Sequence, residues 1–181
     1  MKAVCRTCLV VTIALAVGTP VLAQESRSAP LVQQLTSALT AAKLDSIAAR
    51  DPAHPDVFFG ALFYPGSMCL SVSATYSAPS LLNEALSKGG SAYREIYMDL
   101  STASVPESRI TVEDIGCDGL KPSKTDNRFD VYEAAGKRVA FDGEFRAQKL
   151  TEEQYNKAFA DADEQYAREL TALLAQLKKK S

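Results

Sequence analysis

The clearest hydrophobic pattern in the chain lies near its C-terminus. Between residues 150 and 178, apolar side chains recur at steps of three and four, with charged and polar side chains between them. This period places the apolar side chains on one side of a helix. The stripe consists of Tyr155, Phe159, Ala162, Tyr166, Leu170, Leu173 and Leu177. The sequence therefore predicts a long amphipathic helix over about residues 151–178.

The sequence also predicts where this helix starts and how long it is. Thr151 and Gln154 have the spacing of a capping box, in which each side chain binds the backbone N–H of the other residue. A helix from Glu152 to Leu177 is about 39 Å long at about 1.5 Å per residue. We expect this length to exceed the width of a small sheet, which leaves the far end of the helix available to a protein partner.

A second helix is predicted near the N-terminus, over residues 28–50. Ser28 is a suitable N-cap and Pro30 suits the first turn. Apolar side chains follow at helical spacing at Leu31, Leu35, Leu39 and Ala42. Pro52 and Pro55 resist helical structure and end the segment.

The middle of the chain has the two-residue alternation and the short apolar runs that are typical of strands. Residues 57–64 are apolar on both faces, which indicates a buried strand, and the turn residues after them predict a hairpin with the next strand. A short helix is predicted over residues 77–90. The predicted strands are residues 57–64, 68–76, 93–100, 109–115 and a hairpin over 129–141 that turns near Ala135 and Gly136.

These elements predict an α+β fold. Strands close together in the chain favour a mostly antiparallel sheet, with one main helix before the strands and the long helix after them in the sequence. The order of the elements does not decide whether the sheet closes into a barrel.

The first 23 residues have the layout of a secretory signal peptide. Lys2 and Arg6 precede an apolar run over residues 8–18, and small residues follow it up to Ala23. The run is too short for the hydrocarbon core of a membrane, which needs about 20 apolar residues. We expect cleavage after Ala23 and a periplasmic or secreted single domain over residues 24–181, without a stable membrane anchor.

The charge of the chain argues against a nucleic-acid partner. The formal net charge is −2 at pH 7, and loss of the leader removes Lys2 and Arg6 and makes it more negative. Nucleic-acid-binding domains usually carry a basic patch. The three lysines at residues 178–180 most simply complement the dipole at a helix C-terminus.

Two cysteines remain after the expected cleavage, Cys69 and Cys117. In an oxidising compartment such a pair most often forms a disulfide, and we expect one here. Two free thiols are the first alternative. A redox-active pair is the second, although catalytic thiols usually lie close together at a helix N-terminus.

Few other residues suggest chemistry. His54 is the one histidine of the chain, and its proline-rich turn indicates an exposed side chain rather than a catalytic base or a zinc ligand. Acidic residues cluster over 113–118 and 126–130, where calcium is the alternative to solvated turns, but neither stretch matches a calcium-binding loop. No glycine-rich phosphate-binding motif is present. The sequence therefore assigns no catalytic residue, metal or cofactor.

The most ligand-like surface in the sequence is one face of the strand predicted over residues 93–100. Alternation places two aromatic and two acidic side chains on that face, a combination that suits a polar organic ligand or a protein partner. The alternative is an ordinary outer face of a sheet. The four side chains are Tyr93, Glu95, Tyr97 and Asp99.

The stretches FFGALFYPGSMCLSVSATY, YREIYMDL, RITVEDIGCDGL and YEAAGKRVAFDGEF resemble a group of uncharacterised secreted bacterial proteins. This resemblance covers most of the chain after the leader and implies no activity. Separately, the order strand, strand, short helix, strand, strand over residues 57–115 is similar to the FMN-binding split barrel. The arginine and lysine residues that hold phosphate in that family have no match here.

Two functions follow as hypotheses. The first is a small exported, non-catalytic binding or assembly protein. The second is a flavin- or haem-binding protein or oxidoreductase of the split-barrel type, as the second resemblance implies.

Overall fold

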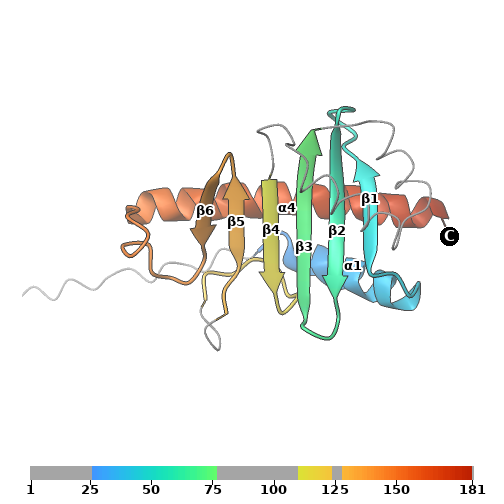
Figure 1. Cartoon of the computed structure of the whole chain (residues 1–181), viewed down its shortest axis with the longest axis horizontal. Coiled ribbons are helices and arrows are strands. Elements are labelled where there is room, and N and C mark those ends of the chain that lie inside the picture. Colours follow the sequence, from blue (N-terminus) through green and yellow to red (C-terminus); the bar gives the residue numbers. More distant parts are fainter. Residues whose placement is uncertain (1–25, 77–109, 124–127, 181) are drawn as a thin grey trace, which may run out of the picture.

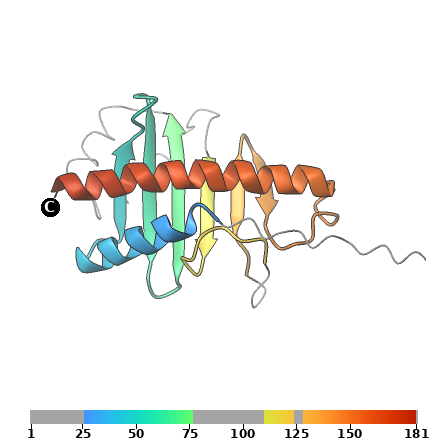
Figure 2. The same ribbon diagram turned by 180° about the vertical axis from the view of Figure 1, so that it is seen from behind.

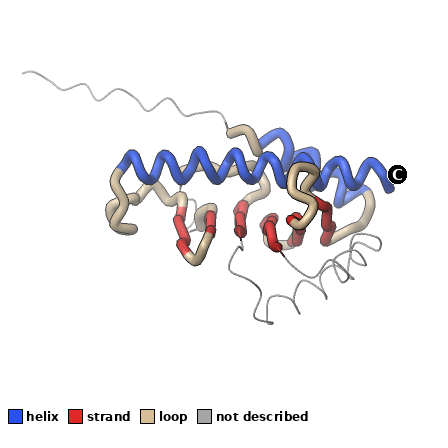
Figure 3. The backbone as a smooth tube through the Cα atoms, turned by 90° about the horizontal axis from the view of Figure 1, so that it is seen from above, coloured by secondary structure: helices blue, strands red, loops and turns tan. Residues whose placement is uncertain are grey.

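A computed structural model describes residues 26–76, 110–123 and 128–180 of the chain. Its strands form one open, antiparallel sheet in the order β1-β2-β3-β4-β5-β6, and both helices lie on the same face of that sheet (Figures 1 and 3). The elements are α1 (Ala29–Ala41), β1 (Ser46–Arg50), β2 (Val57–Tyr64), β3 (Cys69–Tyr76), β4 (Ile110–Ile115), β5 (Val131–Ala134), β6 (Lys137–Ala140) and α4 (Glu152–Lys180). The predicted α+β class, with a mostly antiparallel sheet, an N-terminal helix and a long C-terminal helix, is confirmed.

The hydrophobic core lies between the sheet and the two helices. Alternate residues of the central strands face the helices, and cross-strand register aligns them into rows, such as Ala61, Val72 and Val112. The buried side of α4 supplies Tyr166, Leu170 and Leu173 to the same core, each 0% exposed. The predicted strands over residues 57–64 and 68–76 are confirmed as an antiparallel hairpin.

The hairpin predicted over residues 129–141 is also confirmed, as β5 and β6. Its turn residues Ala135 and Gly136 both have positive φ, 49° and 72°. Two consecutive left-handed residues are typical of the tight turns that join antiparallel strands. The helix predicted over residues 77–90 and the strand predicted over residues 93–100 lie outside the described residues.

Helix α4 has the predicted start and crosses the whole sheet (Figure 2). Thr151 Oγ1 accepts the N–H of Gln154 at 3.1 Å, and Gln154 Oε1 accepts the N–H of Thr151 at 2.9 Å, so the capping box is formed. The apolar stripe is buried against the chain's own sheet as far as Leu177, which is 9% exposed. A partner that bound α4 would therefore meet its polar face or its last turn, which extends beyond β1.

The N-terminal helix is shorter than predicted. It ends at Ala41, and residues 46–50 form strand β1 instead of further helical turns. The end is a Schellman motif: Lys43 N–H bonds to Thr40 O at 3.1 Å, and Leu44 N–H bonds to Leu39 O at 2.9 Å. Pairing of β1 with β2 then wins over the helical propensity of the alanines.

Replacement of Lys43 by glycine is expected to stabilise the protein by about 0.5–1 kcal/mol. Lys43 occupies the left-handed position of the Schellman motif with φ 54°, which costs an L-residue about 1–2 kcal/mol and glycine almost nothing. The higher entropy of glycine in the unfolded chain offsets part of this gain. Urea denaturation of the wild type, K43G and the control K43A checks it; equal stability of K43G and K43A contradicts the role of φ.

Among the described residues, no helix is long and apolar enough to cross a membrane.

Candidate functional site

The loop that follows β4, residues 116–121, is held from inside by buried carboxylates. Its backbone turns sharply, with positive φ at Gly116, Cys117 and Gly119. These turns direct successive N–H groups inward, where they need acceptors. Asp114, which is 0% exposed, accepts the N–H groups of residue 118 at 3.2 Å and Gly119 at 2.9 Å. It also accepts the hydroxyl of Tyr166 from α4 at 3.2 Å.

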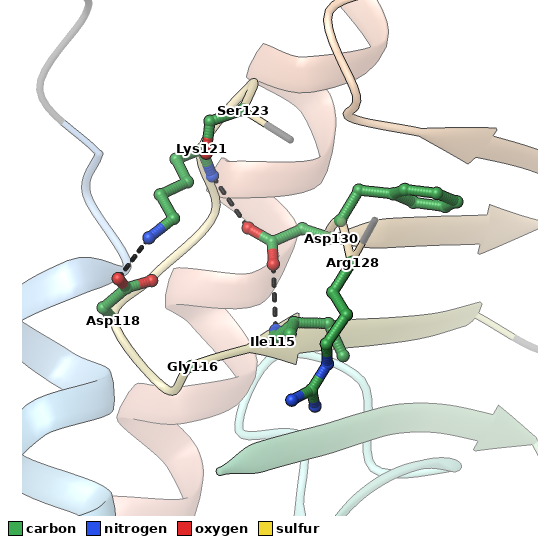
Figure 4. Close-up of a pocket in the computed structure, with 8 residues that line it drawn as sticks. Ile115, Gly116, Asp118, Lys121, Ser123, Arg128 and Asp130 are labelled. Atoms are coloured by element: carbon green, nitrogen blue, oxygen red, sulfur yellow. Dashed lines mark hydrogen bonds and ion pairs between the residues drawn. The ribbon is translucent and has the colours of Figure 1, made fainter. Parts of the chain in front are cut away.

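A second carboxylate closes the other side of this loop. Asp130, which immediately precedes β5, is 2% exposed and accepts the N–H groups of Ile115 and Lys121, both at 2.9 Å (Figure 4). Asp130 therefore ties the beginning of β5 to the end of β4 and to the far end of the loop.

A third carboxylate connects the loop to both helices. Asp163 of α4 accepts the hydroxyl of Ser28 at 2.6 Å and the N–H of Arg27 at 2.7 Å, at the start of α1. The hydroxyl oxygen of Ser28 in turn accepts the N–H of Leu120 at 3.1 Å. The predicted N-cap role of Ser28 thus differs in form, because its hydroxyl makes no capping bond to α1 and instead bridges α4 to the loop.

These contacts shape a pocket of about 260 Å³ between the loop and the segment before β5 (Figure 4). Asp118 and Lys121 form an ion pair on one wall. Arg128 extends from the other side and donates to Ser67 O at 3.0 Å. Asp130 lies between them. The described lining consists of Ile115, Gly116, Asp118, Lys121, Ser123, Arg128, Phe129 and Asp130.

Burial and mutual repulsion change the acidity of the carboxylates around the pocket. Burial raises the pKa of Asp130 to about 7, and the nearby charge of Asp114 adds to the rise, against two backbone hydrogen bonds that lower it. Burial likewise raises the pKa of Asp114. Asp130, which forms the floor of the pocket, is therefore about half protonated at pH 7.

Both cysteines lie next to this site, and both are free thiols in the structure. The predicted disulfide between Cys69 and Cys117 is therefore not what the structure shows. Cys117 belongs to the core between the sheet and the helices, whereas Cys69 alternates with the core residue Leu70 and so faces the opposite side of β3. The left-handed backbone at Cys117 turns its side chain into the core.

We expect the thiol of Cys117 to resist alkylation in the folded protein. It is 7% exposed, and burial raises its pKa to about 12, which leaves almost no thiolate at neutral pH. Iodoacetamide labelling of residues 24–181 at pH 7.5, followed by peptide mass spectrometry, should modify Cys117 only after denaturation. Labelling of Cys117 in native buffer as fast as in urea contradicts this burial; a Cys69–Cys117 disulfide in the same spectra contradicts the free-thiol structure.

A separate buried carboxyl group belongs to α4 itself and lies on its core-facing side. Glu169 is 0% exposed; its Oε1 accepts the amide of Gln165 at 2.7 Å, and its Oε2 has no hydrogen-bond partner within the described part of the chain. Burial raises its pKa to about 8; Gln165 and Arg168 lower it, and Asp51 raises it again. A carboxyl group with this pKa is mostly protonated at neutral pH.

The one histidine lies at the opposite end of the strands, in the turn after β1. The side chain of His54 is 61% exposed, as predicted, and its Nδ1 lies 3.1 Å from Asp51 Oδ2. Burial raises the pKa of Asp51, but the Ala53 N–H, His54 and Arg168 outweigh it and hold that pKa below its ordinary value. This turn is not part of the pocket.

The described parts of the two acidic stretches, residues 113–118 and 128–130, lie together around the pocket. Asp114 and Asp130, however, use their oxygens to hold the loop backbone. Across residues 26–76, 110–123 and 128–180, no group of three His, Cys, Asp or Glu side chains is arranged to bind a metal ion. The predicted ligand face of Tyr93, Glu95, Tyr97 and Asp99 lies outside the described residues.

Sequence reasoning did not find Arg128, Asp163 or Glu169. Glu169 does lie at a helical step from Tyr166 and Leu173, which was a sign that it faces the core. Asp163 likewise lies at a helical step from Phe159 and Tyr166. Arg128 carries no such local sign, because its partner Ser67 is far away in the sequence.

No protein-family model matches the chain, and neither a curated protein nor a solved structure is similar enough to match it.

Proposed function

We propose that this protein is an exported, non-catalytic binding protein whose ligand site is the pocket between residues 116–121 and 128–130. The observation that carries the proposal is the construction of the pocket floor. The carboxylate of Asp130 is 2% exposed and fixed by two backbone N–H groups, so the polar groups are already in place before a ligand arrives. Preorganised polar groups in a concave site are typical of ligand-binding pockets.

The chemistry around the pocket supports binding rather than catalysis. Cys117, in the loop beside the pocket, has a pKa of about 12 and is a poor nucleophile, and burial raises the pKa of Cys69 as well. His54 lies at the other end of the strands, bonded to Asp51. Asp114 and Asp130 are engaged with the backbone of their own loop, so their hydrogen bonds maintain the shape of the pocket.

The flavin- or haem-binding alternative has no specific support in the described residues. Their sheet is an open meander. The pocket is smaller than the range of about 300–1,000 Å³ usual for sites of drug-sized ligands. Export, with cleavage after Ala23, is part of the proposal and is checked by N-terminal sequencing of the protein recovered from its native envelope.

The binding role is tested by NMR with uniformly ¹⁵N-labelled protein, residues 24–181, and a library of small polar compounds. Binding compounds should shift the amide signals of residues 115–121 and 128–130. The pocket-filling variant Ser123→Phe should abolish those shifts, while Lys137→Phe, on the exposed turn side of β6, should keep them. Shifts that survive in S123F, or that map only elsewhere, mean that the pocket is not the ligand site.

A further inference from the structure

One wall of the pocket is an ion pair, and the other carries a positive charge without a carboxylate partner among the described residues. Asp118 comes from the loop after β4, and Arg128 comes from the segment before β5, on the other side of the cavity (Figure 4). The charge of Lys121 is matched by its ion pair with Asp118. The guanidinium of Arg128 is bonded to the neutral carbonyl of Ser67, so its positive charge has no carboxylate partner within the described residues.

Asp130, at the floor of the pocket, supplies the negative charge opposite Arg128. Both oxygens of Asp130 accept neutral backbone N–H groups rather than a cation. When Asp130 is ionised, its charge is therefore balanced only at a distance. A carboxylate has about four lone-pair sites, so Asp130 can accept a further donor from the pocket side.

We propose that the pocket takes a small zwitterion, with its carboxylate on Arg128 and its ammonium group on Asp130. This inference rests on the binding role proposed above. Arginine suits a carboxylate because its planar guanidinium can donate two parallel hydrogen bonds. The cavity of about 260 Å³ lies just below the range of about 300–1,000 Å³ usual for drug-sized ligands, which suits a smaller ligand.

Protonation of Asp130 gives this site a specific pH response. Its pKa of about 7 means that it gains a proton as the pH falls from 8 to 6. An ammonium group then loses an ionic partner, whereas a simple anion loses a repelling charge. The titratable and charged groups around Asp130 are Asp114 on β4, Cys117, Asp118 and Lys121 in the loop, Arg128 on its own segment, Cys69 on β3 and Tyr166 on α4.

Three probes of similar size test the charge requirement: glycine, acetate and ethylamine, each titrated by NMR. At pH 8 we expect glycine to bind with Kd about 10 mM, acetate about 3–10-fold more weakly, and ethylamine more weakly still. Arg128→Ala should raise the Kd for glycine by about 10-fold or more, the usual effect of losing a hydrogen bond to a charged group. Arg146→Ala, an exposed arginine outside the pocket, should leave it unchanged. As the pH falls from 8 to 6, the affinity for glycine should decrease and the affinity for acetate should increase.

The outcomes separate the two proposals. Ethylamine binding as tightly as glycine, glycine binding unchanged in R128A, or a pH response of the same sign for glycine and acetate overturns the zwitterion. If these probes leave residues 115–121 and 128–130 unperturbed at 100 mM while library compounds bind there, the zwitterion is wrong and the binding site stands. If no compound perturbs the pocket, both proposals fail.

Discussion

Replacement of Glu169 by glutamine or methionine is expected to stabilise the protein by about 2–4 kcal/mol more at pH 8 than at pH 5. Glu169 is 0% exposed and its Oε2 is unpartnered among the described residues, so its charged form is costly in the folded protein. Because a domain of this size is stable by only about 5–15 kcal/mol, this one side chain controls a large fraction of the total.

The sign follows from where Glu169 holds its proton. The ordinary pKa of glutamate is 4.5, which applies to the unfolded chain, whereas burial raises the pKa in the folded state to about 8. Between these two values the folded protein keeps a proton that the unfolded chain has released. The stabilisation from this group is therefore complete below pH 4.5 and is lost as the pH rises through about 8, by about 1.4 kcal/mol per pH unit.

Urea denaturation at pH 5, 6, 7 and 8 measures this effect as the difference between each variant and the wild type. Asp130 titrates in both proteins, so the difference isolates Glu169 together with its charged neighbours Arg168 and Asp51 and the neutral phenol of Tyr132. Glu164→Gln is the matched control, because this glutamate on the same helix has a side chain that is 77% exposed. A difference for E169Q and E169M that stays constant across the four pH values refutes the buried, protonated state.

Replacement of Gly119 by alanine is expected to cost about 3 kcal/mol or more, or to prevent folding. A Cβ at this position would lie 2.5 Å from the Cα and 2.6 Å from the N of Ala29, which are backbone atoms at the start of α1. Neither atom can move without moving the helix. The residue also has φ +89°, a conformation that alanine rarely adopts.

Two other glycines separate these causes. Gly136 has φ +72° but open space around it, so Gly136→Ala should cost only about 1 kcal/mol from backbone strain. Gly66 has open space and no positive φ, so Gly66→Ala should change stability by less than about 0.5 kcal/mol. Circular dichroism and urea denaturation of the three variants check the order. G119A as stable as G136A would show that the loop does not press against α1.

The features that the sequence predicted correctly depend on neighbours along the chain. The capping box joins Thr151 to Gln154, and the hairpin turn uses Ala135 and Gly136, so the necessary residues are adjacent. The two-residue alternation of β3 and the helical stripe of α4 are likewise periods within one element. Interactions between residues that are near each other in the chain decide these features, and a single sequence is enough to predict them.

The errors and omissions depend on distant contacts. Residues 46–50 are as compatible with a helix as with a strand, and pairing with β2 decides in favour of the strand. Asp163 meets Ser28 across 135 positions of the chain, and Tyr166 meets Asp114 across 52. The disulfide was inferred from compartment and number of cysteines, but the side of the sheet on which each thiol lies depends on the turn at Cys117. The pocket exists only because such contacts bring residues 116–121 and 128–130 together.

The placement of α4 has a consequence for how the chain is made. Helix α4, which packs against the apolar face of the sheet, is synthesised after all the described strands, and it also supplies Asp163 to the first described helix. Domains that fold during synthesis do so as complete units. A ribosome-bound chain that lacks residues 152–180 has only α1 to cover its sheet and lacks the hydrogen bonds that Asp163 accepts at the start of α1. The apolar face of the sheet therefore stays partly uncovered until residues 152–180 have been synthesised.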